Sequence, residues 1–214
     1  MARIDFLPKQ YECFKALTID SPAKWVLFGG GRGGAKSFTG CVWQIQRRLK
    51  YPGTRGLIGR SKLDTLKKTT LKTFFEVATM YGLHAEKHFT FNAQLNVITF
   101  KNGSEILLKD LFAYPSDPEF QQLQGLELTD AWVDEAAQVS RRAVEILYSC
   151  LRYKMREYDL PPKILLTCNP HKGWLYHEFY LPWRDKTMPA ERAFVQSLAY
   201  DNPHLPESYV ATLD

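Results

Sequence analysis

The sequence predicts an α/β fold with a mainly parallel central sheet, flanked by helices and carrying an added antiparallel hairpin. Three observations lead to this prediction. A glycine-rich turn near residue 30 joins an apolar segment to a helical segment. Short apolar segments then alternate with helical patterns along the chain, which is typical of parallel sheets with crossover helices. An Asn-Gly pair at residues 102–103 separates two segments of strand character, which indicates a hairpin.

The composition is that of an ordinary globular protein. The chain has 214 residues, of which 45% are hydrophobic and 24% charged, enough for one large domain or two small ones. The sequence contains no run of ~20 apolar residues and no apolar signal core at its start, so we expect no membrane association. Its four cysteines lack a CxxC spacing, which favours reduced thiols in a cytosolic protein. The net charge of +5 is compatible with a polyanionic partner.

The first predicted element is a short amphipathic helix over residues 8–17. Gln10 lies near its start, about twenty residues before the glycine-rich turn. A glutamine amide can donate to an adenine edge and accept from it at once, so Gln10 is a candidate base reader. The alternative is a solvent-exposed helix glutamine, which we would prefer without the turn that follows.

A phosphate-binding loop is predicted between a buried strand over residues 24–29 and a helix over residues 35–50. The loop consists of Gly30, Gly31, Arg32, Gly33, Gly34, Ala35, Lys36 and Ser37. Its glycines let the backbone point several N–H groups at one anion, and the helix N-terminus adds a partial positive charge. We expect Lys36 to reach the β- and γ-phosphates of ATP and Ser37 to hold Mg²⁺ through its hydroxyl.

Ala35 departs from the usual pattern G-x-x-x-x-G-K-S/T, which has a glycine at this position. We expect alanine to be tolerated if the residue already has a helical φ angle. The alternative for the whole stretch is a flexible glycine turn that a chance Lys-Ser pair follows.

Residues 55–108 are predicted to form a strand, a long helix and three short strands. The strand covers residues 55–60, and the helix covers residues 62–81. Arg60 lies at the C-terminal end of the strand, where open α/β sheets place their ligands. The short strands cover residues 89–91, 95–100 and 105–108. Because a hairpin joins the last two, we expect an antiparallel edge on a mainly parallel sheet.

The early turns of the helix over residues 62–81 are basic. They carry Lys62, Lys67, Lys68 and Lys72. This face suits a nucleic-acid backbone. A solvated helix face is at least as good an explanation.

Two carboxylates follow the apolar segment 131–133. An acid at the end of a buried strand can hold Mg²⁺ through its water shell, and the next acid can orient and deprotonate a water that attacks the γ-phosphate. We assign Asp134 to the metal and Glu135 to the water. An apolar run before an Asp-Glu pair is common by itself, but this one follows the phosphate-binding loop by roughly a hundred residues, in the expected order.

The last third of the chain is predicted to form a helix over residues 141–155, a buried strand from residue 163, a short helix over residues 173–183 and a strand over residues 193–198. The buried strand ends in Thr167 and Asn169. Both side chains could hydrogen-bond the γ-phosphate or its water. For Asn169, simple turn chemistry before a proline is an equal alternative.

With both motifs in place, the chain resembles the ATPase domain of phage terminase large subunits, the motors that package viral DNA. Residues 30–37, 133–138, 165–170 and 201–205 carry this resemblance. It implies a RecA-like P-loop NTPase fold of the ASCE type and Mg²⁺-dependent hydrolysis of ATP. It also implies double-stranded DNA, a portal protein and a small terminase subunit as partners. The expected setting is a homo-oligomeric ring docked on a procapsid in the host cell cytoplasm.

The resemblance also suggests a domain organisation. Residues 1–200 correspond to the ATPase domain, and residues 201–214 to an exit segment at the start of a linker. Terminases usually carry a nuclease domain after such a segment. The sequence ends at Asp214 before any cluster of metal-binding carboxylates, so no nuclease activity is expected from it.

Several arginines are implied in catalysis by the resemblance. Arg32 lies within the loop and is the expected contact to the nucleotide of its own subunit. Some family members place a second arginine, which acts on the neighbouring subunit, where this sequence has Gln124. A glutamine cannot neutralise phosphate charge, so a trans-acting arginine must come from elsewhere. The candidates are Arg141, Arg142 and Arg152.

Two other functions fit parts of the sequence. A two-lobed helicase would also combine an adenine-reading glutamine with an Asp-Glu pair, but 214 residues leave no room for a second RecA-like lobe. A non-hydrolysing P-loop scaffold or DNA-binding module is the other alternative. The presence of Lys36, Ser37, Asp134 and Glu135 argues against it.

Overall fold

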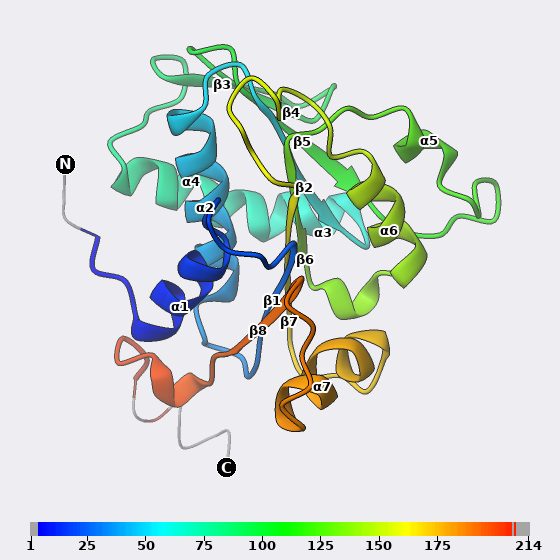
Figure 1. Cartoon of the computed structure of the whole chain (residues 1–214). Coiled ribbons are helices and arrows are strands. Elements are labelled where there is room, and N and C mark those ends of the chain that lie inside the picture. The colour runs from blue at the N-terminus through cyan, green and yellow to red at the C-terminus, as the bar shows by residue number, and fades with distance from the viewer. Residues whose placement is uncertain (1–3, 207, 209–214) are drawn as a thin grey trace.

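The structure, a computed structural model, describes residues 4–206 and 208. In this part of the chain, eight strands form one sheet. They are β1 (Trp25–Gly29), β2 (Arg55–Arg60), β3 (Phe89–Asn92), β4 (Val97–Phe100), β5 (Glu105–Asp110), β6 (Asp130–Asp134), β7 (Lys163–Cys168) and β8 (Arg192–Gln196). Their order across the sheet is β3-β4-β5-β2-β6-β7-β1-β8 (Figure 1).

The sheet is parallel except at one edge. Strands β5, β2, β6, β7, β1 and β8 pair in parallel, whereas β3 pairs with β4 and β4 with β5 in antiparallel fashion. The turn between β4 and β5 contains Asn102 and Gly103, and Gly103 has a φ of +81°, which glycine adopts without strain. The predicted α/β fold with an added hairpin is therefore confirmed.

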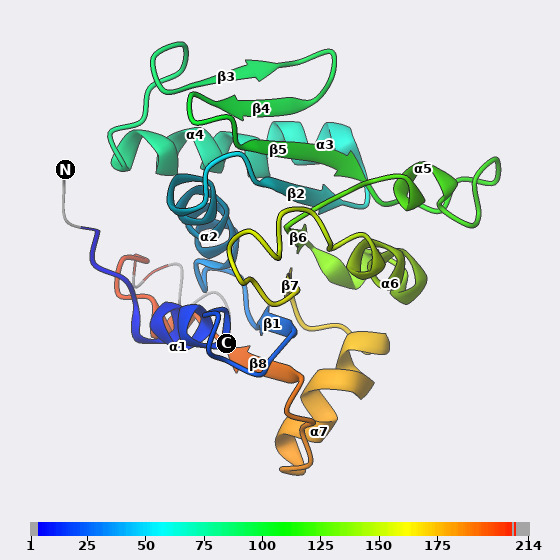
Figure 2. The ribbon, with the colours of Figure 1, turned by 45° about the horizontal axis from the view of Figure 1, so that its top comes forward.

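Helices cover both faces of the sheet. They are α1 (Pro8–Ala16), α2 (Lys36–Lys50), α3 (Leu63–Lys68), α4 (Thr70–Met80), α5 (Gln121–Gln124), α6 (Arg141–Ser149) and α7 (Leu181–Arg184). The short 3-10 helices are η1 (Ala136–Gln138) and η3 (Ala199–Asp201), and the π-helix η2 (Tyr176–Tyr180) runs directly into α7. Figure 2 shows α2 and α6 on opposite sides of β6 and β7.

Alternate strand residues supply two separate cores. In β1, Val26 and Phe28 face the core beneath α1, α2 and α4, whereas Leu27 faces the core beneath α6. In β6, Trp132 faces the first core and Val133 the second. Side chains in a strand point to opposite faces in turn, so a nearly continuous apolar strand produces a sheet covered on both sides.

One predicted helix is interrupted, and another ends earlier than the sequence predicts. The helical pattern over residues 62–81 breaks at Thr69, whose φ of −123° and ψ of −74° lie outside helical values. The pattern over residues 141–155 stops at Ser149, because the following backbone pairs with Leu128 instead. Leu128 N–H donates to the Cys150 carbonyl at 3.0 Å, and Arg152 N–H donates to the Leu128 carbonyl at 2.9 Å. At Ser149, a contact with a distant segment therefore overrides the local helical pattern.

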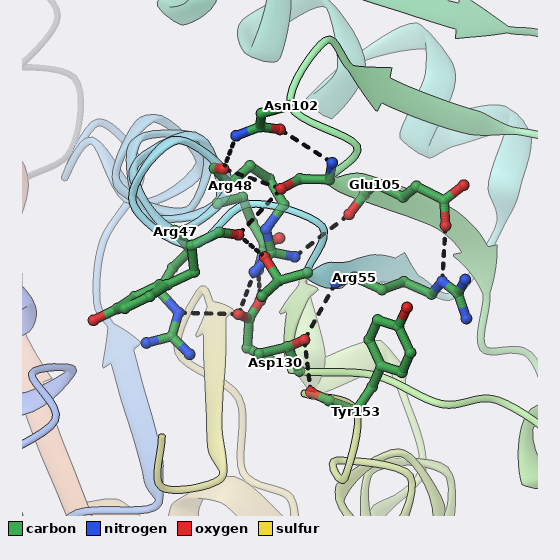
Figure 3. A network of polar contacts seen from close by, with 12 residues as sticks. Arg47, Arg48, Arg55, Asn102, Glu105, Asp130 and Tyr153 are labelled. Carbon is green, nitrogen blue, oxygen red and sulfur yellow. Dashed lines mark hydrogen bonds and ion pairs between the residues drawn. The ribbon is translucent and has the colours of Figure 1, made fainter. Parts of the chain in front are cut away.

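A buried ionic network joins α2 to the sheet (Figure 3). The Asp130 carboxylate, which is fully buried at the start of β6, accepts from Gln44 Nε2 at 2.9 Å, from Arg47 Nε at 3.0 Å and from Arg48. Burial by itself would raise the pKa of Asp130, but the Arg48 and Arg47 guanidinium groups outweigh it and hold this pKa below its usual range. The Arg48 carbonyl in turn accepts from Asn102 of the hairpin turn at 2.8 Å.

We expect Asp130→Ala to lower the free energy of unfolding by about 3–5 kcal/mol, because it leaves two buried guanidinium groups without their anion. Urea denaturation at neutral pH measures this loss. The matched control is Glu127→Ala, which removes an exposed ion pair to Arg152 and should change stability by less than ~0.5 kcal/mol.

The effect of Asp130→Ala should depend on pH. The folded-state pKa of Asp130 lies below its unfolded value, so its contribution is present above the unfolded pKa and is lost as the pH falls through the folded pKa. The stability difference between the parent protein and the variant should shrink on acidification. Equal losses for the Asp130 and Glu127 variants would contradict this account.

Candidate functional site

The predicted phosphate-binding loop lies at the C-terminal end of β1, and α2 begins directly after it at Lys36. The acidic pair lies at the C-terminal end of β6. Because β1, β7 and β6 are neighbours in parallel, all three end at the same edge of the sheet. Ser37 Oγ consequently donates to Asp134 Oδ1 at 3.2 Å, across 97 residues of sequence. The two motifs therefore meet in one site.

Asp134 has hydrogen-bond donors on both carboxylate oxygens and is only 2% exposed. Oδ1 accepts from Ser37 Oγ and, at 2.9 Å, from Thr167 Oγ1. Oδ2 accepts from Thr70 Oγ1 at 2.6 Å, and Arg60 Nη1 lies 3.4 Å from it. A buried carboxylate requires such partners, and here they come from α2, β7, α4 and β2.

The hydroxyl of Ser37 and the carboxylate of Asp134 are hard oxygen ligands and fit Mg²⁺. No cluster of three or more His, Cys, Asp or Glu side chains that could hold a metal occurs among residues 4–206 and 208. Magnesium does not need one, because it keeps several waters and takes phosphate oxygens of the substrate as ligands. The donor set is therefore suitable for Mg²⁺ that is bound together with a nucleotide.

Thr167 has a different place from the one predicted. Its side chain is fully buried, and its hydroxyl accepts from Trp132 Nε1 at 2.9 Å while it donates to Asp134. Because its one proton is donated to Asp134, this hydroxyl does not donate to a phosphate in this arrangement, while a contact with the water stays a prediction. Thr167 instead positions the carboxylate of Asp134.

Asn169 and Glu135 lie together at the mouth of the site. Asn169 Nδ2 donates to Glu135 Oε1 at 3.4 Å. Glu135 follows the last residue of β6 in a left-handed conformation, with φ of +53°, which turns the chain sharply and leaves the side chain partly exposed. The structure thus gives Asn169 a partner in the site, while its predicted contact with a phosphate or its water stays a prediction.

Lys36 is mostly buried, and its ammonium group donates to the Gly31 carbonyl within the loop. Burial lowers the pKa of Lys36, and the negative charges of Glu135 and Asp134 oppose this shift. The lysine therefore lies close to both acids, as the sequence predicts.

Ala35 has a φ of +54° and a ψ of 25°, which is the left-handed conformation. The condition under which we expect alanine to be tolerated here, a helical φ angle, is therefore not met. For an L-residue, this conformation is higher in energy than the right-handed one by roughly 1–2 kcal/mol. The surrounding loop must therefore hold Ala35 in place. The glycine of the usual pattern avoids this strain.

The segment after β8 supports the loop from outside. Ser197 Oγ donates to the Gly34 carbonyl at 3.0 Å, and Asn202 Nδ2 donates to the Gly33 carbonyl at 2.7 Å. Gly30 has a φ of +140°, and a Cβ there would lie 2.0 Å from the Ser197 carbonyl oxygen. Only glycine therefore permits this close approach, which the sequence did not reveal.

The predicted exit segment over residues 201–214 begins with residues that belong to this support. Residues 207 and 209–214 lie outside the described part of the chain. The boundary between the ATPase domain and the exit segment therefore stays a prediction.

Gln10 is 3% exposed, so the alternative of a solvent-exposed helix glutamine was wrong. Its carbonyl oxygen accepts from Leu7 N–H at 2.8 Å, and its amide donates to Thr39 Oγ1 at 2.9 Å. The bond to Thr39 ties α1 to α2 directly beside the loop. Contact with adenine stays a prediction.

The predicted catalytic arginines lie on the surface. Arg32 is exposed in the loop and makes no hydrogen bond or ion pair with another residue in the described part of the chain. The candidate trans-acting arginines form exposed ion pairs: Arg141 with Glu145 and Glu178, Arg142 with Glu119, and Arg152 with Glu127. Arg141 begins α6 after the acidic pair, whereas Arg152 pairs with Glu127, which lies shortly before β6 at the opposite edge of the sheet. Their action on a neighbouring subunit stays a prediction.

Four residues that support the site were not among the predicted site residues. They are Arg60, Thr70, Ser197 and Asn202. Two of them had a sequence signal: Arg60 ends a predicted strand at the edge where ligands bind, and Asn202 lies in a stretch that carries the resemblance. Thr70 and Ser197 had none and reach the site through packing between distant segments.

A family model described as phage terminase large subunit matches residues 23–214. The PBSX phage terminase large subunit of Bacillus subtilis strain 168 is 28% identical over 202 residues, which cover 86% of this chain and 44% of that protein.

Among solved structures, the large terminase of a thermophilic bacteriophage in complex with ADP has a TM-score of 0.70 at 18% identity, over 97% of this chain and 49% of that one. The ATPase domain of the Thermus phage P74-26 large terminase has a TM-score of 0.64 at 16% identity, over 98% of this chain and 87% of that one. These likenesses show a RecA-like P-loop fold. The chain spans about half the length of the PBSX protein and of the terminase with ADP.

Thr167→Val should lower the free energy of unfolding by about 1–3 kcal/mol, because valine keeps the shape but leaves the buried Trp132 N–H without an acceptor. Urea denaturation measures this loss. Thr79→Val is the matched control, since the Thr79 hydroxyl is exposed and bonds only the Phe75 carbonyl of its own helix among the described residues. A loss for Thr167→Val no larger than the control's ~0.5 kcal/mol would show that the hydroxyl does not have this role.

Proposed function

Because the chain belongs to the phage terminase large subunit family, we propose that it hydrolyses ATP with Mg²⁺ and thereby drives double-stranded DNA into a procapsid. The observation that carries this proposal is the meeting of the loop with the acidic pair. Ser37 and Asp134 are hydrogen-bonded, and Lys36 lies close to Asp134 and Glu135. A P-loop that only bound a phosphate would not need the second acid, which is partly exposed at the mouth of the site.

Each residue of the site has a role in this reaction. The loop N–H groups and Lys36 bind the β- and γ-phosphates, and Arg32 contacts the nucleotide of its own subunit. Ser37 and Asp134 hold Mg²⁺, which when bound neutralises phosphate charge. Glu135 accepts the proton of the attacking water, and Asn169 holds the Glu135 carboxylate toward the site.

The adenine side of the site lies toward α1 in this proposal. Gln10 is beside α2 and contacts Thr39, three residues after Lys36. To read adenine, its amide must exchange at least one of its present hydrogen bonds for a bond to the base.

The partners follow from the family. We propose a homo-oligomeric ring that docks on a portal protein in the host cytoplasm, with a small terminase subunit as a further partner. Within residues 4–206 and 208, the helices are too short or too polar to cross a membrane. No observation favours a helicase or a non-hydrolysing scaffold.

Glu135→Gln should keep nucleotide affinity and lower the turnover of ATP by about 10²–10⁴-fold, because the glutamine cannot accept the proton of the water. Phosphate release measures turnover, and binding of a fluorescent ADP analogue measures affinity. The matched control is Glu157→Gln, whose carboxylate pairs with Lys154 on the surface. Undiminished hydrolysis in the Glu135 variant would remove this residue from the mechanism.

Lys36→Ala should weaken nucleotide binding instead, by about 1.5–3 kcal/mol, because it removes a charged contact to phosphate. The same fluorescence titration measures it, and Lys154→Ala is the control for loss of a surface lysine. An unchanged affinity would contradict the assignment of Lys36 to the phosphates.

If a neighbouring subunit supplies an arginine, ATPase activity per subunit should rise with protein concentration, because such an arginine contributes roughly 10³–10⁵ in rate. Alanine variants of Arg141, Arg142 and Arg152 should identify this arginine. The variant that lacks it should bind nucleotide as the parent does, but its activity per subunit should no longer rise with protein concentration. A specific activity that is independent of concentration, with and without DNA, would contradict a trans-acting arginine.

A further inference from the structure

The shortest hydrogen bond to Asp134 comes from a helix that neither motif predicts. Thr70, the first residue of α4, is 1% exposed, and its hydroxyl donates to Asp134 Oδ2 at 2.6 Å. The contacts of the same carboxylate with Thr167 and Ser37 are longer, at 2.9 Å and 3.2 Å. The orientation of Asp134 is therefore tied to the position of the α4 N-terminus.

Thr70 has this position because the helix breaks at Thr69. The Thr69 hydroxyl donates to the Thr65 carbonyl at 2.7 Å, a back-bond that bends helices, and accepts from Arg60 Nη1 at 2.8 Å. Arg60 Nη1 also lies 3.3 Å from Thr70 Oγ1 and 3.4 Å from Asp134 Oδ2. A continuous chain of polar contacts thus runs from the α3–α4 junction to the carboxylate.

The Arg60 side chain is mostly buried, and its Nε has no hydrogen-bond partner in the described part of the chain. Its guanidinium group is held by two hydroxyls and one carboxylate oxygen through a single nitrogen. Such a buried guanidinium group has few hydrogen bonds, so small displacements of its partners change its free energy. Each hydrogen bond that is lost leaves more of its desolvation penalty uncompensated. A shift of the α3–α4 junction would therefore change the hydrogen bonds that orient the Asp134 carboxylate.

The outer surface of the same junction is strongly basic. Its lysines form no ion pair with a described acidic residue, and Asp64 is the one acid between them in sequence. They are Lys62, Lys67, Lys68 and Lys72. Lys67 is half-buried and the other three are exposed. Lysines without an ion pair suit a closely spaced row of phosphates, because a nucleic acid releases condensed counterions when such lysines bind it.

We propose that this junction, residues 62–72, binds the phosphate backbone of double-stranded DNA and transmits that binding to the nucleotide site through Thr70. Bound DNA holds the junction in the arrangement in which Thr70 fixes Asp134, so the site takes up Mg²⁺ with nucleotide more tightly. By linkage, Mg²⁺ with nucleotide tightens DNA binding by the same factor. This inference rests on the proposed function, whose DNA partner and metal it uses.

The test is the Mg²⁺ concentration needed for half-maximal binding of a fluorescent ADP analogue, with and without a short DNA duplex. For the parent protein, DNA should lower this concentration about fivefold or more. Thr70→Val should raise it without DNA and abolish the shift, because valine cannot donate to Asp134. Thr70→Ser keeps the hydroxyl donor, so it should show the parent's Mg²⁺ requirement without DNA and the parent's DNA-induced shift. Thr79→Val is the control on the same helix.

The lysines are tested separately from Thr70. The double variant Lys67→Ala/Lys68→Ala should keep the parent's Mg²⁺ requirement without DNA and lose the DNA-induced shift. It should also bind the duplex more weakly and with a smaller dependence on salt. The control double variant Lys87→Ala/Lys101→Ala removes two exposed lysines near the hairpin and should behave as the parent protein does.

The inference would be overturned if DNA did not change the Mg²⁺ concentration that the parent protein needs. It would also be overturned if the Lys67→Ala/Lys68→Ala variant kept the DNA-induced change in that concentration. A Thr70→Ser variant that behaves as Thr70→Val does would overturn the role of the hydroxyl. Binding and hydrolysis are read separately. ATP hydrolysis without a DNA-induced shift contradicts this inference alone, whereas a DNA-induced shift without hydrolysis contradicts the proposed function alone.

Discussion

The carboxylate of Asp134 is the point on which the site depends. A buried carboxylate is stable only with hydrogen-bond donors around it, and Asp134 receives them from Ser37, Thr167 and Thr70 on three separate elements. The need to satisfy one anion therefore brings the start of α2, the end of β7 and the start of α4 to the same place. The geometry expected of a magnesium and nucleotide site follows from that convergence.

A second buried acid, Asp130, lies at the other end of β6 and anchors the other end of α2 through Arg47 and Arg48. Between the two acids, the helix packs so closely on the strand that a Cβ at Gly40 would lie 2.1 Å from Trp132. The helix that begins at Lys36 is thus fixed to β6 at both ends and in the middle. This arrangement keeps Lys36 and Ser37 in register with the acidic pair.

Much of the fold and the centre of the site could be predicted from the sequence. The strand before the loop, the Asn-Gly hairpin and the strand before Asp134 are short patterns whose chemistry is local, and each is confirmed. The left-handed conformation of Ala35 was missed, because an alanine in the place of a glycine shows the departure but not the backbone angle that results. The end of the helix at Ser149 was misplaced, because Leu128, distant in sequence, pairs with the backbone that follows it.

What the sequence by itself determined is the identity and order of the chemical groups: a glycine-rich loop, Lys36, Ser37, Asp134 and Glu135, on a sheet of apolar strands. The tertiary structure decided which other side chains reach these groups. It turned Thr167 away from the phosphates and toward Asp134, placed Thr70 on the same carboxylate and set Asn202 against the loop. The physical reason is that hydrogen-bond partners of buried polar groups are chosen by packing between distant segments, and local sequence patterns do not record that packing.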